Sequence, residues 1–383
     1  MSKIHITLVG GQPAPVYQGI IATSPDKIIY IYSEGSKEVL DNIKKEIKID
    51  SNKLKLDVTD PTKIKTRAED LADKYANDEV TVNISSGLKS WSHWFSVIFD
   101  KYENASVVYI DQNNLLWNYR SMKSFECSTI DMHTLFRLYG NSIDKKNYTP
   151  LESYTKEDYD AVLEIEKIRK INYPVFNRLT ILDNRSQNIL RNQKNGSFKD
   201  HATNSEITWD KESKKVELKI VKRNQSYRFD ISSPHSTDLI FSAGWFELKI
   251  AKMLSKWNKA KEIYLNCRFQ SKDRIDKNEV DILVYTGSKI LFVECKTQIT
   301  NNTDIDKFRS VIKGYGGTGS KGLFITDAKM SNIAKEKCEE RNILSFSLQD
   351  EHLDLSQKEQ IKISPEEALY RLLDNNLKSI NTR

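Results

Sequence analysis

The sequence has few cysteines, and their spacing excludes two common structural roles of cysteine. Cys127, Cys267, Cys295 and Cys338 are scattered over 383 residues, without a Cys-x-x-Cys pair or a Cys/His spacing of the zinc-binding kind. A disulfide framework and a zinc finger are therefore excluded. We expect reduced thiols and a cytoplasmic protein, with Cys295 packed as a small apolar residue inside a strand.

Long apolar runs and a P-loop are also missing. No apolar run approaches the ~18 residues of a membrane-spanning helix. The N-terminal MSKIHITLVGG lacks the basic start and apolar core of a signal peptide. A P-loop is absent, Gly10-Gly11 does not form the dinucleotide motif GxGxxG, and the sequence has no repeats or low-complexity tracts. These absences predict a soluble intracellular protein and argue against a P-loop, nicotinamide or flavin enzyme.

The sequence does contain abundant charge with a small basic excess. Charged residues make up 29% of the chain, the net charge is +6 and the pI is about 8.8. This balance favours a polyanionic partner without requiring one. Hydrophobic residues make up 38%, which is enough for two cores at this length.

Residues 1–145 alternate between strand and helix patterns. Apolar, β-branched segments occur at 4–9, 28–32, 54–58, 80–84 and 106–110, with helical segments near 16–23, 36–47, 62–76 and 88–102. This alternation predicts an α/β domain with a parallel sheet and helices on both faces.

The remaining chain divides into a linker and a second α/β domain. Residues 146–204 are polar and predict a linker with one or two helices. From 205 to 383 we expect antiparallel strands first, followed by a helix, a hairpin, a helix and a strand. The last four of these are predicted at 243–257, 279–296, 304–313 and 322–326.

Four charged residues stand in the otherwise apolar hairpin: Glu279, Asp281, Glu294 and Lys296. If Gly287 and Ser288 form a two-residue loop, the numbers of paired residues sum to 575. Asp281 then lies opposite Glu294, Glu279 lies opposite Lys296, and all four project from one face. The apolar residues are Val280, Ile282, Val284, Leu291, Val293 and Cys295 on one face, and Leu283, Tyr285, Ile290 and Phe292 on the other.

Two interpretations of this charged group are open. In one, Glu279 and Lys296 form an ion pair at the end of the sheet, and Asp281 and Glu294 are solvated. In the other, the opposed carboxylates bind a divalent metal that relieves their repulsion. A third acidic residue favours the metal. Glu247 borders the apolar stripe of a helix formed by Phe246, Ile250, Met253, Leu254 and Trp257.

Glu247, Asp281 and Glu294-Cys295-Lys296 resemble the PD-(D/E)xK nuclease motif, in the same order of helix acid, strand acid and strand ExK. The likeness covers roughly 205–350, and Val280 stands where that family commonly has proline. The resemblance implies that Asp281 and Glu294 hold Mg²⁺ or Mn²⁺, with Glu247 as a further ligand, directly or through water. It implies that Lys296 orients or stabilises the attacking hydroxide. Downstream, the glycine-rich KGYGGTGSKG (313–322) is either a phosphate-contacting loop beside the metal or a turn.

Polar loops follow each predicted strand of the first domain: GGQPAP (10–15), SEGS (33–36), TDP (59–61), SSGLKS (85–90) and DQNN (111–114). In a parallel sheet all of them gather at the carboxyl edge, where α/β folds bind ligands. Backbone N–H groups at helix N-termini and Lys89 suit phosphates. The residues predicted to bind a ligand are Gly10, Gly11, Gln12, Pro13, Ser33, Glu34, Thr59, Ser85, Ser86, Gly87, Leu88 and Lys89.

The NISSGLKSW segment resembles the glycine-containing strand-to-helix loop of CARF domains, which sense cyclic oligoadenylates, although Leu88 replaces the usual hydroxyl residue. A Rossmann-like sensor (1–145), a helical linker (146–204) and a PD-(D/E)xK domain (205–383) together resemble the Can/Card-type ancillary nucleases of type III CRISPR systems. The resemblance implies a homodimer activated allosterically by one cyclic tetra-adenylate. It also implies cleavage of single-stranded RNA and DNA, and nicking of duplex DNA.

Two alternatives remain open at this stage. One is a constitutive restriction-type or repair endonuclease with a structural N-terminal domain. The other is a non-catalytic regulator that binds a cyclic nucleotide, although 146–200 contains no convincing helix-turn-helix. Assays with and without cyclic oligoadenylates separate these alternatives.

Overall fold

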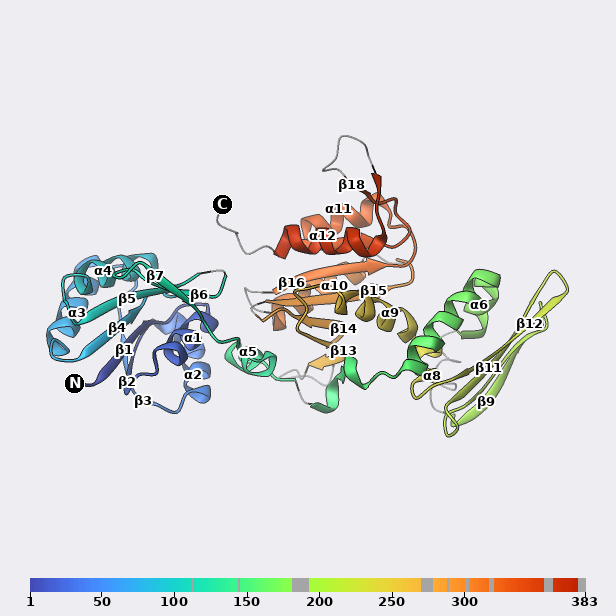
Figure 1. Cartoon of the computed structure of the whole chain (residues 1–383), viewed down its shortest axis with the longest axis horizontal. Helices are drawn as coiled ribbons and strands as arrows, with labels where there is room; N and C mark the ends of the chain where they lie inside the picture. Colours follow the sequence, from blue (N-terminus) through green and yellow to red (C-terminus); the bar gives the residue numbers. More distant parts are fainter. Residues whose placement is uncertain are drawn as a thin grey trace.

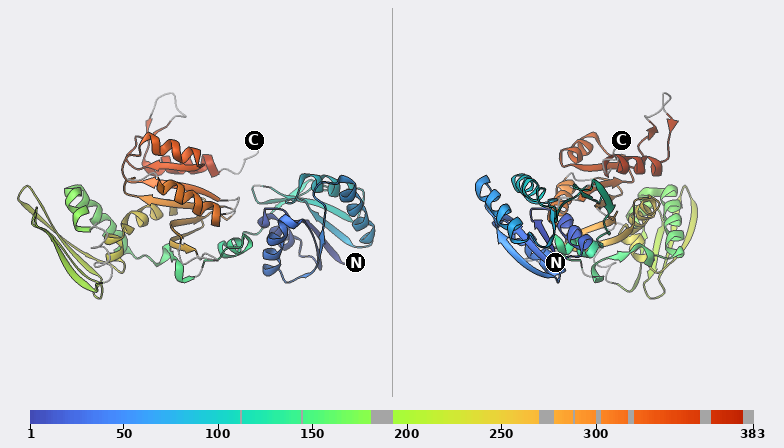
Figure 2. Two further views of the ribbon diagram at one scale, coloured as in Figure 1. Left: turned by 180° about the vertical axis from the view of Figure 1, so that it is seen from behind. Right: turned by 60° about the vertical axis from the view of Figure 1, so that its left-hand side comes forward.

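The computed structural model describes residues 1–111, 113–143, 145–180, 193–269, 278–287, 289–299, 303–316, 320–354 and 361–377. The chain forms three main sheet-based parts along one long axis (Figures 1 and 2). An N-terminal α/β domain lies at one end, a C-terminal α/β domain lies in the middle, and a four-stranded antiparallel sheet lies at the other end. Within the described ranges, no helix is long and apolar enough to cross a bilayer.

The N-terminal domain is a doubly wound sheet, as its alternating pattern predicts. Its elements are β1 (Lys3–Leu8), α1 (Pro13–Thr23), β2 (Lys27–Tyr32), η1 (Glu34–Ser36), α2 (Lys37–Glu46), β3 (Asp50–Lys55), α3 (Pro61–Lys74), β4 (Glu79–Asn83), α4 (Lys89–Phe99), β5 (Ala105–Ile110), β6 (Leu115–Asn118) and β7 (Lys123–Glu126). The strand order is β3-β2-β1-β4-β5-β6-β7, parallel from β3 to β5. Apolar residues of α1 and α2 join one core cluster and those of α3 and α4 join another, so helices cover both faces.

Strand β3 corrects the sequence prediction, which located it at 54–58. The observed strand is Asp50–Lys55, and every side chain in it is exposed or half-buried. As an edge strand it pairs only with β2, so it needs no apolar run of its own. The apolar residues that suggested a later strand include Leu56, which packs into the core just beyond its end.

The C-terminal domain has a six-stranded sheet in the order β17-β16-β15-β14-β13-β8. Its elements are β8 (Thr149–Pro150), α9 (Gly244–Ser255), β13 (Glu262–Phe269), β14 (Asn278–Tyr285), β15 (Ile290–Lys296), α10 (Thr303–Tyr315), β16 (Ser320–Thr326), α11 (Asn332–Glu340), β17 (Ile343–Ser347), β18 (Leu353–Asp354), β19 (Ile361–Lys362) and α12 (Pro365–Leu377). Strands β13, β14 and β15 are antiparallel, whereas β15, β16 and β17 are parallel. The predicted helices, hairpin and strand of this region are all present.

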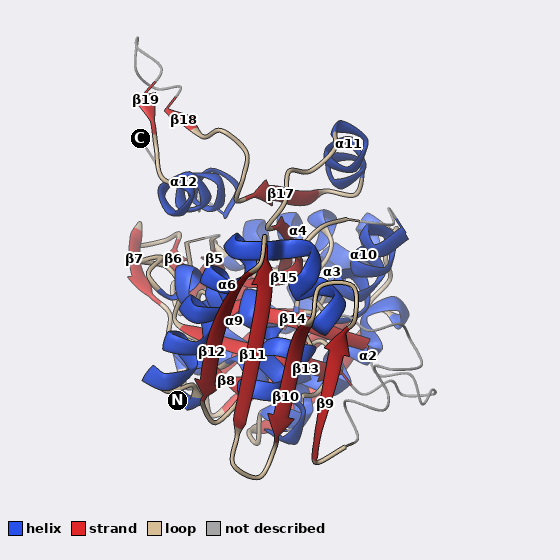
Figure 3. Ribbon diagram, turned by 90° about the vertical axis from the view of Figure 1, so that its right-hand side faces the viewer, coloured by secondary structure: helices blue, strands red, loops and turns tan. Residues whose placement is uncertain are grey.

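Residues 146–204, predicted as a helical linker, contain a helical segment that is kinked at Asn172 and a strand of the separate sheet. The elements here are η2 (Lys145–Asn147), η3 (Leu151–Ser153), α6 (Lys156–Thr180), β9 (Asn195–Asp200), β10 (Ser205–Asp210), β11 (Lys215–Lys222), β12 (Gln225–Ser232) and α8 (Ser236–Phe241). Strands β9–β12 form an antiparallel sheet in which each strand pairs with the next one in the chain (Figure 3), and α6 packs on this sheet. The antiparallel strands predicted after residue 205 are therefore β10–β12.

The two α/β domains share a core through α5 (Met132–Leu138), which lies between them (Figure 1). The ring of Phe136 on α5 packs edge-on against Phe269 of β13, with centroids 5.3 Å apart. The hydroxyl of Tyr285, at the end of β14, donates to the carbonyl of Ile130. The hairpin of the C-terminal domain is thus in direct contact with the N-terminal half.

Candidate active site and sensor cavity

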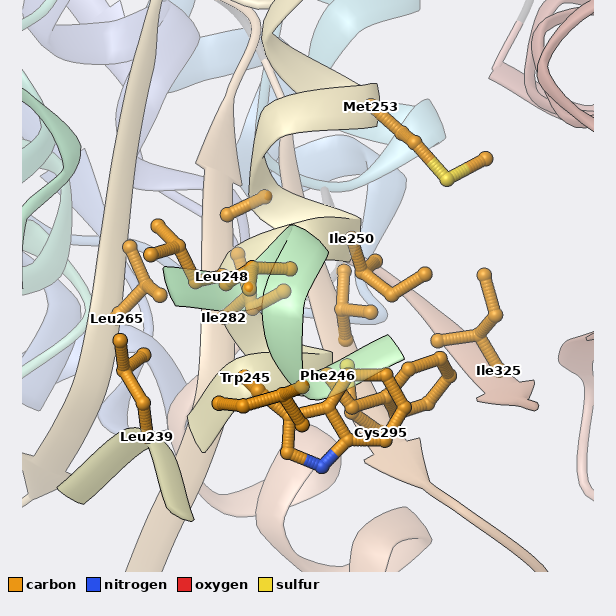
Figure 4. Packing of buried hydrophobic residues seen from close by; sticks show 14 of the residues in the cluster. Leu239, Trp245, Phe246, Leu248, Ile250, Met253, Leu265, Ile282, Cys295 and Ile325 are labelled. Atoms are coloured by element: carbon orange, nitrogen blue, oxygen red, sulfur yellow. The ribbon is translucent and has the colours of Figure 1, made fainter. Parts of the chain in front are cut away.

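Helix α9 carries Glu247 in its first turn. The apolar stripe predicted from the sequence is buried, with Phe246, Ile250 and Leu254 each at most 1% exposed (Figure 4). Figure 4 shows this stripe packed against the sheet beside Ile282 and Cys295. Glu247 is half-buried at the border of the stripe, as predicted.

The register of the β14–β15 hairpin follows the predicted sum of 575. The observed pairs are Ile282–Val293, Leu283–Phe292, Val284–Leu291 and Tyr285–Ile290. The turn is closed by a hydrogen bond of 3.0 Å from the Thr286 N–H to the Lys289 carbonyl. Gly287 adopts a φ of 92°, which a side chain would disfavour.

Counted from the turn, the β14–β15 ladder ends at the Ile282–Val293 pair, so Asp281 and Glu294 do not form the predicted ladder pair. Instead, the Asp281 carboxylate accepts a hydrogen bond of 2.7 Å from the backbone N–H of Cys295. The Asp281 side chain thus accepts the Cys295 N–H in place of a backbone carbonyl of the neighbouring strand. Asp281 and Glu294 therefore remain neighbours without forming a regular cross-strand pair.

A local distortion next to Asp281 also changes which faces the apolar residues occupy. Leu265 and Ile282 belong to the core beneath α9, whereas Cys267 and Val280 belong to the core on the α10 side. Strict alternation would keep Val280 on the same face as Ile282, as the sequence predicted. Asn266 has a φ of 53°, and no ladder pair joins it to Asp281. Such distortions, like β-bulges, re-aim side chains beside active sites.

The ion pairs differ from the simple alternative of a Glu279–Lys296 bridge. The Nζ atom of Lys296 lies 2.6 Å from Oε1 of Glu294. Glu279 instead pairs with Arg268, with Nη2 3.2 Å from Oε1. Lys296 therefore contacts the cluster of acidic side chains through Glu294 and does not pair with Glu279.

Burial and mutual repulsion raise the pKa of each clustered carboxylate. Burial raises the pKa of Glu247 well above its usual value, and the charge of Asp281 raises it further. Burial also raises the pKa of Asp281, against the opposing effects of Lys296 and the Cys295 N–H. Burial and Asp281 raise the pKa of Glu294 to about 7. For Lys296, burial acts to lower the pKa, but Asp281 and Glu294 outweigh it and raise the pKa.

A cleft of about 640 Å³ lies beside this cluster. Glu247, Asp281 and Lys296 line it, together with Glu279 and Arg268. Within the part of the chain that the structure describes, no set of three or more His, Cys, Asp and Glu side chains is arranged to hold a metal ion. The cluster is thus an acidic site with one internal cation. The sequence reasoning did not single out Tyr154, His235 and Asn266, which also line this cleft, because they come from segments without a motif.

The raised pKa of Glu294 predicts a pH-dependent stability for the metal-free protein. The folded chain retains this proton up to about pH 7, whereas an unfolded glutamate releases it near its ordinary value of 4.5. The folded state binds more protons between these values, so the free energy of unfolding falls as the pH rises through them. The shifted pKa of Glu294 changes the free energy of unfolding by about 3 kcal/mol over this pH range. Denaturation in EDTA at pH 5 and pH 8 measures it, and Glu294→Gln is expected to flatten the dependence. Equal slopes for both proteins would contradict the assignment.

In the N-terminal domain, the loops after β1 and β4 are in close contact. The N–H of Gly10 donates to Oγ of Ser86 at 3.1 Å. A Cβ atom on Gly10 would lie 2.5 Å from the nitrogen of Gly87, so only glycine allows this approach. Gly87 also has a φ of 85°. Two of the predicted ligand-binding loops are therefore brought together.

A cavity of about 410 Å³ lies at the carboxyl ends of β1, β4 and β5. Gln12 and Ser85 line it as predicted residues, and Asp111 and Asn114 of the DQNN loop line it as well. The strand order reverses between β1 and β4, which is where α/β sheets form ligand crevices. Sequence reasoning missed Gln18, which lines the cavity from α1 and donates to Asn114.

The other predicted ligand-binding residues are not on the described lining of this cavity. Gly11 is exposed and Pro13 begins α1. Leu88 and Lys89 are exposed at the start of α4. Ser33, Glu34 and Thr59 follow β2 and β3, on the far side of β1 from β4. Glu34 pairs with Lys55 at 2.7 Å. The strand order, which the sequence could not supply, separates these two groups of loops.

The C-terminal domain contributes to the same cavity through its hairpin tip. Tyr285, Gly287 and Lys289 line the cavity. Burial lowers the pKa of Lys289, and the nearby charges of Lys259 and Lys321 lower it further. No ion pair joins Lys289 to another described residue. No sequence motif marked these residues, since the contact depends on how the two domains pack.

The glycine-rich segment 313–322 lies away from the carboxylate cluster. Lys321 pairs with Leu291 at the start of β15, whereas Glu294 and Lys296 lie at its end. The ring of Tyr315 stacks on Phe269, with centroids 4.2 Å apart. The interpretation as a phosphate-contacting loop beside the metal is therefore wrong for the described residues. Residues 317–319 of the segment lie outside them.

Known proteins resemble this chain in its N-terminal domain and in its overall fold. Residues 4–135 match the family model of the Card1 CARF domain. No curated protein matches the chain by sequence. The structure of Can2 from Sulfobacillus thermosulfidooxidans in complex with cyclic tetra-adenylate is similar, with a TM-score of 0.68 and 14% identity over 98% of this chain and 100% of Can2.

Two further solved structures share the fold. Protein VC1899 from Vibrio cholerae has a TM-score of 0.68 and 12% identity, over 98% of this chain and 97% of that protein. A type III CRISPR defence DNA nuclease activated by cyclic oligoadenylate has a TM-score of 0.56 and 14% identity, over 98% of this chain and 52% of the nuclease. At these identities the likeness establishes the fold.

The fold is that of a two-domain α/β protein whose N-terminal sheet is of the Rossmann-like CARF type. By its family match, the N-terminal domain belongs to the CARF domains, specifically to the Card1 type. The chain as a whole has the architecture of Can2. The resemblance to Can/Card-type proteins is thereby confirmed.

Proposed function

We propose that this protein is a metal-dependent endonuclease that a cyclic oligoadenylate activates, and that it acts in type III CRISPR antiviral defence. The observation that carries the proposal is the set of Glu247, Asp281 and Lys296 in a cleft, with Glu294 paired to Lys296, in a domain joined to a CARF domain. The similarity to a CRISPR defence DNA nuclease and to Can2 with its bound ligand supports it.

The carboxylate oxygens of the cluster are the donor type that Mg²⁺ and Mn²⁺ prefer. Burial and mutual repulsion raise the pKa values of Glu247, Asp281 and Glu294, so a divalent cation would stabilise their ionised forms. Asp281 and Glu294 would hold the ion directly, and Glu247 would hold it through water. When bound, such an ion lowers the pKa of water and neutralises charge on the phosphate. This arrangement is the basis for assigning the domain to the PD-(D/E)xK class.

Lys296 would stabilise the attacking hydroxide beside the cluster. Its ammonium group stays protonated because the flanking carboxylates raise its pKa. Lys146, Lys211 and Arg268 also line the cleft, where cations favour a phosphate backbone. On the resemblance to Can/Card-type nucleases, we propose single-stranded RNA and DNA as substrates, together with nicking of duplex DNA.

The CARF domain would bind the activator at the crevice between β1 and β4. Gln12, Ser85 and Asn114 supply polar groups to the cavity there. Lys89 stands at the start of α4, in the loop next to it. We propose cyclic tetra-adenylate as the ligand, held across the twofold axis of a homodimer by two such domains.

The β14–β15 hairpin would carry the activating signal. Its tip lines the sensor cavity through Tyr285 and Lys289, and its other end bears Asp281 and Glu294. A ligand that binds against the tip can shift the hairpin only by its differential affinity for the active arrangement. Residues of α5, of the hairpin and of the N-terminal domain belong to one hydrophobic core, so the hairpin is packed directly against the sensor domain.

The proposed function is tested by cleavage of single-stranded RNA and DNA with Mn²⁺, with and without cyclic tetra-adenylate. Lys89→Ala removes a cation next to the ligand site, which is worth ~1.5–3 kcal/mol. We expect activation to need roughly ten- to a hundredfold more ligand, with recovery at saturation. Lys101→Ala, an exposed lysine beyond α4, is the control. Full cleavage without any ligand would leave the constitutive endonuclease as the better explanation.

Lys289→Ala tests the contribution of the nuclease domain to the sensor cavity. This lysine faces the cavity without a described carboxylate partner, so an anionic ligand would gain a contact from it. We expect the activation curve to shift to about tenfold higher ligand concentration. The affinity for Mn²⁺, measured calorimetrically without ligand, should not change. A variant that activates like the Lys101→Ala control would remove the hairpin tip from the ligand site.

A further inference from the structure

A histidine and a buried aspartate form a second polar group in the nuclease cleft. His235 precedes α8 and lines the cleft together with Glu247, Asp281 and Lys296. Its Nδ1 atom lies 3.0 Å from Oδ2 of Asp158, and its backbone N–H donates to Oδ1 at 3.1 Å. Asp158 on α6 is fully buried, so both of its oxygens hold the histidine in one orientation.

The contacts leave one imidazole nitrogen for the cleft. Burial acts to raise the pKa of Asp158, but hydrogen bonds from Thr155 and His235 outweigh it and lower the pKa. The ionised carboxylate only accepts hydrogen bonds, so Nδ1 of His235 carries the hydrogen. Among the described residues no hydrogen bond to Nε2 is formed, so this nitrogen is available to the cleft and carries a hydrogen in the imidazolium form. The side chain is 29% exposed, which leaves it accessible to a substrate.

Neighbouring groups fix the ring in this position. The ring of Tyr154 packs against the imidazole, with centroids 4.6 Å apart. Lys211 from the β10–β11 turn and Asp238 from α8 line the cleft as the nearby charged groups. Thr155 donates its backbone N–H to Asp158 at 2.9 Å. The aspartate is therefore fixed independently of the histidine.

Hydrolysis of a phosphodiester requires a proton on the leaving oxygen, because an alkoxide is a poor leaving group. The carboxylates are assigned to the metal, and Lys296 is assigned to the nucleophile. Burial raises the pKa of Tyr154, which makes its hydroxyl a weak acid. Histidine is the side chain whose charge changes near neutral pH, so it suits this transfer.

We propose that His235 is the proton donor for the leaving oxygen, with Asp158 as its positioning residue. This inference rests on the proposed nuclease function. As the water oxygen bonds to phosphorus and the bond to the leaving oxygen breaks, the imidazolium of His235 transfers its Nε2 proton to that oxygen and becomes neutral. The product is a free hydroxyl, and the neutral imidazole regains a proton from solvent. The proton lost by the attacking water also passes to solvent.

The test uses substrates in which sulfur replaces the bridging oxygen at the cleaved phosphate. A thiolate leaves without protonation, so the need for an acid disappears. His235→Gln is expected to lower kcat about a hundredfold on the oxygen-linked substrate, with little change in KM. On the sulfur-linked substrate it should match the wild-type protein within a few-fold. Substrates with sulfur at either bridging position identify which oxygen leaves.

His201→Gln, at an exposed turn, is the matched control and should leave both rates unchanged. Asp158→Asn should show the same sulfur rescue with a smaller loss, and thermal unfolding identifies a variant that fails to fold. Equal losses for His235→Gln on both linkages would overturn the proton-donor role, as would full activity on the oxygen linkage. A wild-type protein that cleaves neither substrate would overturn the proposed function itself, and this inference with it.

Discussion

Replacement of Glu294 by glutamine is expected to abolish metal-dependent cleavage without unfolding the chain. The carboxylate is 15% exposed, lies 2.6 Å from Lys296 and has a pKa raised to about 7. Glutamine keeps the shape but cannot supply the charge that a divalent cation requires. We expect a loss of at least about a thousandfold in cleavage at saturating activator. Initial rates with Mg²⁺ and Mn²⁺ measure it.

The same substitution should stabilise the metal-free protein at pH 8, because it removes one charge from a mutually repelling cluster. Glu164→Gln is the matched control, since Glu164 also pairs with a lysine, Lys167 at 2.5 Å, but on the outside of α6. The control should cleave at the wild-type rate. A Glu294→Gln protein that cleaves equally well with Mn²⁺ would remove this residue from the site, and the same reasoning applies to Asp281→Asn.

Replacement of Lys296 by methionine is expected to lower turnover about a hundred- to a thousandfold. The ammonium group is the cation of the cluster: it lies 2.6 Å from Glu294, and the charges of Asp281 and Glu294 raise its pKa. Methionine preserves much of the side-chain volume and removes the charge that would stabilise an attacking hydroxide. The carboxylates remain, so calorimetric Mn²⁺ affinity should be retained.

Lys167→Met is the matched control, because it breaks a comparable lysine–glutamate pair on an exposed helix surface. Loss of Mn²⁺ binding in the Lys296→Met protein would mean that the lysine organises the metal site rather than the nucleophile. Unchanged turnover would reduce Lys296 to the ion-pairing partner of Glu294.

Local sequence pattern predicted the elements near the candidate active site well. The two-residue loop at Gly287 fixed the hairpin register, and the apolar stripe from Phe246 to Leu254 fixed the buried face of α9. These features depend on contacts between residues close in the chain, and periodicity records such contacts. The position of β3 was predicted poorly because an edge strand needs no apolar run.

The geometry of the acidic group was less predictable. The break in the ladder at Asp281 and the positive φ of Asn266 interrupt an alternation that looks regular in the sequence. Asn266 lies on β13, a strand distant in the chain from the ExK segment. A pattern within one strand cannot report a distortion that depends on its neighbour.

The two α/β units, the hairpin register and the order of acidic residues could be predicted from the sequence, because these follow from short-range periodicity and turn chemistry. The tertiary structure was needed to establish which polar loops share a cavity, since the strand order β3-β2-β1-β4-β5 separates Ser33 and Thr59 from Ser85. It alone brought Lys289 to the sensor cavity and His235 to the nuclease cleft. These contacts join segments far apart in the chain, and such contacts are set by domain packing, which leaves no periodic signal in the sequence.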